Sequence, residues 1–434
     1  MKVLHISTVD FGGAGTAALR LHFNLRASGL DSRMLTSKSR SGDPDVVASG
    51  GLALMVRSTV WKVLLRLWAR RRYAFQNQNL TNAGAMEFWG RNGDFVPDVI
   101  VAHSVSNFLT LGDIRKGDRS TQIPIVWHLL DMGPLTGGCH YAWDCRGYTG
   151  ECGRCPAIRS GRKDDKSQRA LAAKVVAAHG ANIAFVAASG WLRRQAAEAT
   201  VCHGKRVEQI LLGVDPEVFR PVPKEEARRR LGLPDGARIV FVGALSMKEA
   251  RKGLGVLIKA LSLLAERYGA RRRDVMVVTA GKDPDLVRLD RCGFPRRHLS
   301  LLTGDRALAM AYQAADVFVC PSIEDSGPMM INEAIMSGTP VAAFDMGVAV
   351  DLVHTGQTGY RALLGDAGDL ARGIGFVLSS DEVAARSMAS ECRALGMKYC
   401  HPEVQARAFT KLFSSMHLQN ADRRESPSER GPVD

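Results

Sequence analysis

Short runs of apolar residues, uninterrupted by polar positions, recur along the chain and are separated by segments long enough for helices. Such a run is typical of a strand in a parallel sheet covered on both faces, because a strand with one wet face alternates apolar and polar residues. The pattern therefore predicts an α/β fold with doubly wound parallel sheets. The predicted strands are 3–7, 98–102, 123–127 and 183–186 in the first half, and 238–242, 275–279, 317–320 and 340–344 in the second half.

The two series of strands are separated by residues 215–221, a segment punctuated by proline that we interpret as a domain connector. We expect a first domain at 1–207 and a second at 208–402, followed by a helix at 403–418. The last residues, 419–434, are rich in Arg, Ser, Glu and Pro and predict a disordered tail. Where two doubly wound domains face each other, a ligand lies in the cleft at the carboxyl ends of the strands.

The chain has 434 residues and a formal net charge of +14. The length leaves room for two separate cores, and the charge favours anionic partners such as nucleic acid, anionic lipid or phosphorylated small molecules. No apolar run approaches the ~20 residues that span a bilayer, and Asp10 interrupts the N-terminal run before a signal peptide would end. We therefore expect a cytoplasmic protein.

A glycine-rich turn at residues 12–15 follows the first predicted strand and leads into a helix. Residues 13–18 fit G-x-G-x-x-A, a pattern that brings a phosphate to a helix N-terminus. The acidic residue that binds the ribose of NAD about 20 residues later is absent, because residues 33–37 lead into Lys38 and Arg40. An NADP-dependent oxidoreductase is one interpretation, and a turn needed only for close strand-to-helix packing is another.

The most informative segment is 321–334, which joins a predicted strand to a helix. A glycine in this loop frees backbone N–H groups for a phosphate, and the helix N-terminus adds its dipole. Glu333, one turn into the helix, can accept hydrogen bonds from a ribose diol, while Asp325 would lie at the opposite end of the phosphates. The residues expected to contact the donor phosphates are Gly327, Pro328, Met329 and Met330.

This segment resembles the family 4 retaining nucleotide-sugar glycosyltransferases, whose motif is P-S-x-x-E, then seven residues, then E-A-x-x-x-G-x-P. The resemblance extends over residues 1–415 and implies a GT-B fold, in which two Rossmann-like domains face each other across a cleft. The first glutamate of the motif falls on Asp325, with Glu324 one place earlier, so which of the two carboxylates faces the donor sugar stays open. The second glutamate of the motif is Glu333.

The resemblance also implies that the diphosphate of the donor lies between the glycine turn, at Gly12 and Gly13, and a basic pair. This pair is Arg251 and Lys252. Charge builds on the diphosphate as the glycosidic bond breaks, and two preorganised cations stabilise that charge without a metal. We therefore expect no catalytic cofactor. The other interpretation of the pair is a solvated charge cluster at the start of a helix.

Residues 126–141 look like a subgroup of colanic-acid-type and other exopolysaccharide glycosyltransferases. The subgroup has a histidine directly before an aspartate, but Leu130 precedes Asp131 here and the nearest histidine is His128. His128 is therefore our candidate for the contact to the donor sugar. His103 is a candidate for the acceptor side, with a purely structural role as the alternative.

Four of the nine cysteines fall in a loop at 139–155 that has few apolar residues to fix it. Four thiolates bind zinc tetrahedrally and would tie such a loop together. The spacing is looser than in a zinc ribbon, so a structural zinc site, disulfides and free cysteines all stay open. A catalytic metal is not expected, because four cysteines leave no open coordination position. The cysteines are Cys139, Cys145, Cys152 and Cys155.

Residues 55–73 carry six basic and no acidic residues, with apolar residues at helical spacing and two tryptophans. A basic amphipathic helix of this kind suits an anionic membrane surface. The alternative is a helix that buries its apolar face in the domain and exposes its charges. Nucleic acid is not expected as a partner, because no helix-turn-helix, zinc-finger or aromatic stacking pattern accompanies the charge.

The resemblance implies an enzyme that moves a sugar from a nucleoside diphosphate sugar to a saccharide or lipid-linked acceptor, in the synthesis of a surface polysaccharide. The resemblance implies retention of the anomeric configuration by front-face substitution. Two alternatives share the architecture: a nucleotide-sugar epimerase, and a nucleotide-sugar-binding protein that has lost catalysis. The residues expected in the catalytic site are Asp325, Lys252, Arg251 and His128.

Overall fold

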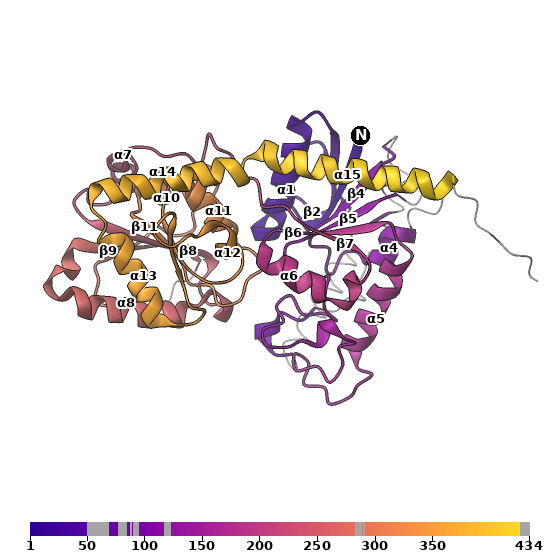
Figure 1. Ribbon diagram of the computed structural model, residues 1–434, viewed down its shortest axis with the longest axis horizontal. Helices are drawn as coiled ribbons and strands as arrows, with labels where there is room; N and C mark the ends of the chain where they lie inside the picture. Colours follow the sequence, from indigo (N-terminus) through magenta and orange to yellow (C-terminus); the bar gives the residue numbers. More distant parts are fainter. Residues whose placement is uncertain are drawn as a thin grey trace, which may run out of the picture.

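The chain folds around two parallel β-sheets, one in each half of the sequence (Figure 1). Our computed structural model describes residues 1–49, 69–76, 85–86, 89, 95–116, 123–282, 289 and 291–425. The first sheet has strand order β3-β2-β1-β4-β5-β6-β7 and the second has order β10-β9-β8-β11-β12-β13. Every pair of neighbouring strands runs parallel. The predicted α/β class, with two doubly wound domains, is confirmed.

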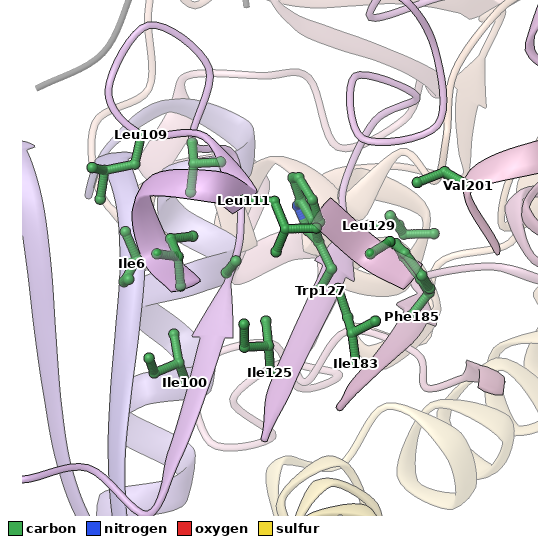
Figure 2. Packing of buried hydrophobic residues seen from close by; sticks show 14 of the residues in the cluster. Ile6, Ile100, Leu109, Leu111, Ile125, Trp127, Leu129, Ile183, Phe185 and Val201 are labelled. Carbon is green, nitrogen blue, oxygen red and sulfur yellow. The ribbon is translucent and has the colours of Figure 1, made fainter. Parts of the chain in front are cut away.

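The first sheet is buried on both faces, as the apolar runs predict. Ile100 pairs with Ile125, which in turn pairs with Ile183, so one row of isoleucines crosses three strands in the cluster that Figure 2 shows. The strands are β1 (Lys2–Val9), β2 (Asp31–Lys38), β3 (Val46–Ala48), β4 (Val99–Ala102), β5 (Ile125–Leu129), β6 (Ile183–Ala187) and β7 (Arg206–Gln209). The helices are α1 (Gly12–Ala27), α4 (Leu111–Lys116), α5 (Lys166–His179) and α6 (Gly190–Glu198).

The second sheet is also covered on both faces. In its central strand, Phe241 packs into one buried cluster and Val240 and Val242 pack into another. The strands are β8 (Arg238–Ser246), β9 (Val275–Lys282), β10 (Arg296–His298), β11 (Val317–Cys320), β12 (Val341–Phe344) and β13 (Gly359–Ala362). The helices are α7 (Lys224–Leu231), α8 (Leu254–Tyr268), α10 (Asp305–Ala314), α11 (Met329–Met336), α12 (Ala349–Leu352), α13 (Ala367–Leu378) and α14 (Glu382–Tyr399).

The last helix, α15 (Pro402–Glu425), returns to the first domain, and Figure 1 shows it lying along that domain. Phe409 and Phe413 of α15 are fully buried in one cluster with residues of α1 and of the first sheet. The predicted disordered tail is therefore wrong for residues 419–425, which continue the helix. Residues 426–434 lie outside the described residues.

The basic segment predicted at 55–73 is described only from residue 69 onward, so the rest of that prediction lies outside the described residues. Its described end contains a short 3-10 helix at Arg71–Tyr73, with the Tyr73 side chain buried. No helix in the described part of the chain is long and apolar enough to cross a membrane.

Candidate active site

A cavity of about 390 Å³ lies between the two domains, at the carboxyl ends of their strands. Its first-domain wall includes Gly13 at the start of α1 and Asp131, two residues beyond the end of β5. Its second-domain wall is formed by the ends of β8 and β11 and by the first turn of α11. This is the position expected for a ligand that bridges two doubly wound domains.

The basic pair and the first acidic residue of the motif form one cluster in this wall. Arg251 Nη1 and Lys252 Nζ each lie 2.6 Å from the same oxygen, Oδ2 of Asp325. Burial alone would raise the pKa of Asp325, but the positive charges of Lys252 and Arg251 outweigh burial and hold it below the usual value. Asp325 is therefore an anion held between two cations at the edge of the cavity.

The backbone around the basic pair is fixed by a close approach between two loops. Gly253 follows the pair with φ +70°, and a Cβ at this position would lie only 1.7 Å from the carbonyl oxygen of Pro321. In addition, the N–H of Ile323 donates to the carbonyl of Arg251 at 2.8 Å. Only glycine fits at position 253, and the contact brings the two cations alongside the motif loop.

Glu333 reaches the cavity from α11, although its side chain is almost fully buried. The hydroxyl of Tyr312 donates to Oε2 at 3.0 Å, and Arg20 Nη2 lies 2.9 Å from Oε1. Burial raises the pKa of Glu333 even though Arg20 acts in the opposite direction. Arg20 belongs to α1 of the first domain and also pairs with Asp305 at 2.9 Å, so it joins the two domains across the cleft.

The structure separates the two adjacent acidic residues of the motif. Asp325 lines the cavity, whereas Glu324 turns away and accepts a hydrogen bond from the backbone N–H of Trp143. Burial raises the pKa of Glu324 to about 7. The four residues expected near the donor phosphates all line the cavity, and they are Gly327, Pro328, Met329 and Met330.

The predicted contact between His128 and a donor sugar is wrong, because His128 is fully buried away from the cavity. Its Nδ1 lies 3.2 Å from Nδ1 of His103, and its ring packs against Phe409 of α15. Side chains alternate along β5, so His128 shares the face of Val126, which is covered by α15. The strand ends at Leu129, and the alternation does not continue into the cleft.

A different histidine accompanies the aspartate at the cleft. Nδ1 of His140 lies 2.8 Å from Oδ2 of Asp131, and the N–H of Gly133 donates to Oδ1 at 2.7 Å. His103 instead lines a second cavity of about 230 Å³ in the first domain, which also has Asp131 in its wall. The acceptor-side role of His103 stays a prediction.

Residues 236–380 match the family described as "Glycosyl transferases group 1". A D-inositol 3-phosphate glycosyltransferase of Corynebacterium urealyticum is 30% identical over 244 residues, which cover 53% of this chain and 55% of that protein. A GDP-mannose-dependent alpha-mannosyltransferase of Mycolicibacterium smegmatis is 36% identical over 158 residues, 36% of this chain and 38% of that protein. The chain therefore spans about half or less of the length of these curated relatives.

Solved structures match over nearly the whole chain. Sucrose-phosphate synthase from Thermosynechococcus elongatus has a TM-score of 0.67 at 18% identity, covering 96% of this chain and 99% of that one. Anabaena HepE in complex with UDP-glucose has a TM-score of 0.64 at 18% identity, covering 96% and 100%. The chain has the GT-B fold. The segment matched by the family contains the basic pair and the two cavity-lining acidic residues of the motif, Asp325 and Glu333.

The sequence analysis missed two first-domain residues, Arg20 and Tyr141, that contact cavity-lining residues of the second domain in this GT-B fold. Arg20 lies seven residues after Gly13 and three after Ala17, a spacing that places all three on one face of α1. This spacing could have identified Arg20 from the sequence as a residue that faces the cleft. Tyr141 gave no such signal, because it lies in an irregular loop, and yet its ring lines the cavity with the Arg251 guanidinium 4.3 Å from the ring centre.

The glycines of the turn at residues 12–15 have different roles, because one allows close packing and another lines the cavity. A Cβ at position 15 would lie 2.6 Å from the carbonyl oxygen of Val9, so Gly15 allows α1 to pack close to β1. Gly13 lines the cavity and has open space around it. Gly12 begins α1 with φ +73° and precedes the lining residue, so it shapes the turn.

The four clustered cysteines surround one cavity of about 30 Å³ in the first domain. All nine cysteines of the chain are described, and none is in a disulfide. In their present arrangement, no three His, Cys, Asp or Glu side chains among the described residues form a ready-made metal site.

Proposed function

We propose that this protein is a retaining glycosyltransferase that moves a sugar from a nucleoside diphosphate sugar to a saccharide or lipid-linked acceptor in the synthesis of a surface polysaccharide. The observation that carries the proposal is the arrangement of one cavity wall, where two cations and a helix N-terminus lie beside a buried carboxylate. The family match over residues 236–380 supports it, as does the naming of two relatives as glycosyltransferases.

The donor diphosphate would lie against Arg251, Lys252 and the first turn of α11. The N-cap residue of α11 is Pro328, and no side chain caps this helix, so its first N–H groups are available to a phosphate. Nε of Arg251 is buried without a hydrogen-bond partner in the described part of the chain. An anionic oxygen would satisfy this donor, since guanidinium and ammonium groups can bind Asp325 and a phosphate together.

The ribose diol would bind Glu333. Its carboxylate can accept two hydroxyl hydrogen bonds, and its present partner Arg20 has a second carboxylate, Asp305, to hold it in place. The sugar would then extend toward Asp325 and the first-domain wall at Asp131. Asp325 accepts hydroxyl hydrogen bonds in this arrangement and keeps its charge, because both cations stay beside it.

In the reaction, the bond between the anomeric carbon and the β-phosphate oxygen breaks, and both bonding electrons stay on the diphosphate. The acceptor oxygen forms the new bond on the same face of the sugar, and its proton passes to the departing phosphate. Arg251 and Lys252 stabilise the negative charge that develops on the diphosphate. Electrostatic stabilisation by preorganised groups is usually the largest single contribution to catalysis.

A thermal-shift titration with UDP, GDP, ADP, NAD and NADP tests the donor site, since a ligand that binds only the folded chain raises its Tm. We expect a shift with one nucleoside diphosphate, and a matching loss of that shift in Glu333→Gln. Glu382→Gln, on the exposed surface of α14, is the control and should behave as wild type. A shift with NADP alone would contradict the proposal.

Transfer itself is tested by release of the nucleoside diphosphate from its sugar conjugate when a saccharide or lipid-linked acceptor is added. Acceptor-dependent release distinguishes a transferase from an epimerase, which releases no nucleotide, and from a binding protein. Analysis of the anomeric configuration of the product then tests retention. Inversion would rule out the front-face reaction.

A further inference from the structure

The loop that holds the four clustered cysteines has almost no regular structure. Between β5 and α5, the only helix is a 3-10 turn at Gly147–Thr149. Four non-glycine residues in this segment have positive φ angles, which a side chain disfavours; they are Trp143, Cys152, Arg154 and Arg159. Such a backbone persists only where its surroundings hold it in place.

The cysteine side chains converge on one place from separate parts of the loop. All four line the same cavity of about 30 Å³. The Cys139 and Cys155 thiols hydrogen bond to each other. A methyl group added at Gly147 would lie 3.5 Å from the Cys145 sulfur and 3.6 Å from the Cys152 sulfur, so these two sulfurs flank one point. The remaining cysteines of the chain do not line this cavity.

Hydrogen-bond donors surround the sulfurs. The backbone N–H groups of Ala157 and Ile158 lie beside the Cys155 sulfur, and that of Gly137 lies beside Cys152. The Ser167 hydroxyl donates to Oδ1 of Asp165 at 2.6 Å. Donors aimed at sulfur stabilise a thiolate, and metal-bound thiolates in proteins are oriented by such outer contacts. A thiol in a purely apolar core has no need of them.

We propose that Cys139, Cys145, Cys152 and Cys155 bind one structural Zn²⁺ ion. The donor set is soft and fourfold, which is the set that zinc takes in closed tetrahedral sites. No three of the sulfurs are arranged as metal ligands in the present structure, so binding requires the cysteine side chains to turn inward toward the shared cavity. The four cysteines leave no position for substrate, which makes the ion a structural one.

The ion would act on the active site through the loop that it fixes. Tyr141, between the first two cysteines, stacks on Arg251 of the basic pair. Two residues later, the backbone N–H of Trp143 donates to Glu324 in the motif loop. Zinc would thus hold a first-domain loop against the second-domain wall of the cavity, and its loss would loosen both contacts.

The first test is the metal content of the full chain, purified with reductant and without a metal-affinity step. We expect one zinc per chain by mass spectrometry, and X-ray absorption showing four sulfur ligands at about 2.3 Å. Zinc bound through nitrogen or oxygen ligands would overturn the proposal. So would less than stoichiometric zinc, whether the four cysteines then titrate as thiols or form disulfides.

Paired variants show which cysteines hold the ion. Cys152→Ala should lose most of the zinc, whereas Cys202→Ala, a buried cysteine of the same domain outside the cluster, should retain it. If Cys152→Ala does not fold, the absorption spectrum of wild-type protein still decides between four sulfur ligands and any other set. Retention of zinc in a folded Cys152→Ala chain would contradict the proposal.

Discussion

The two walls of the cleft are built in different ways. The second-domain wall comes largely from two short stretches of sequence, 243–252 and 320–333, that fold beside each other. The first-domain wall draws on residues scattered from Gly13 to Tyr141, which meet only when the sheet has formed. A contiguous motif can be recognised in one sequence, whereas a wall assembled from dispersed residues depends on the fold. The expected division of labour is chemistry on the second-domain wall and closure on the first.

Lys252→Ala is the sharpest test of the proposal that the second-domain wall carries out the chemistry. We expect transfer to fall by about 10²–10³-fold, because one of two cations facing the leaving group is removed, while Asp325 keeps Arg251 as a partner. Initial rates with saturating donor measure the effect, and the Tm checks folding. Lys259→Ala, an exposed lysine on α8, is the matched control. Wild-type turnover in Lys252→Ala would move the chemistry away from this wall.

The contrast between the walls also explains what the sequence could predict. The central strands were found because both of their faces are buried and their sequences are apolar. Four of the five strands missing from the prediction are at sheet edges, where fewer apolar neighbours are needed. These four are β3, β7, β10 and β13, and two of them read RVEQ and RRH. The fifth, β2, lies next to the edge strand β3 and alternates buried with more exposed residues at its start.

The residues of the candidate site also fall into two groups, those recognised from a contiguous motif and those that only the fold brings together. Asp325, Glu333 and the basic pair were indicated by the resemblance to the family, and the structure places all four residues in the wall of one cavity. His128 was chosen as the histidine nearest to Asp131 in the sequence, and only the fold shows that its side chain is buried against Phe409 of α15. Arg20 could have been found from its spacing on α1, but its partner Glu333 lies more than 300 residues away and only the fold brings them together.

The closing role of the first-domain wall is tested by Arg20→Ala. Removing Arg20 leaves Glu333 buried with only the Tyr312 hydroxyl as a partner, and breaking a buried pair in this way costs on the order of 3 kcal/mol. We expect Arg20→Ala to unfold at a lower urea concentration and to bind the donor more weakly than wild type. Arg20→Lys should give intermediate values of both. Unchanged unfolding in Arg20→Ala would show that the two domains close without this contact.

The buried histidines of the first domain should make its stability depend on pH. Burial lowers the pKa of His128 to about 3 and that of His22 to about 4, while an unfolded chain titrates near the ordinary value. Below the ordinary pKa of histidine, the unfolded state therefore binds more protons than the folded state does. The free energy of unfolding is not reduced by this effect at pH 7, and it decreases as the pH falls. On going from pH 7 to pH 5, each of these two histidines should lower the free energy of unfolding by about 2 kcal/mol.

Urea unfolding of wild type and His128→Leu at the two pH values measures this dependence. The variant should lose less stability on acidification and should bind nucleoside diphosphate as wild type does, since His128 does not line the cleft. Weaker nucleotide binding in a fully folded His128→Leu chain would return this residue to the first-domain wall.

The smallest expected effect concerns Tyr141, the point where the two walls touch. The aromatic face over Arg251 stabilises the guanidinium by about 1 kcal/mol, so Tyr141→Ala should raise the KM for the donor about fivefold with little change in kcat. Tyr141→Phe keeps the ring and should match wild type. A loss of activity in Tyr141→Phe as large as in Tyr141→Ala would assign the role to the hydroxyl, and the first-domain wall would then take part in the chemistry as well as in closure.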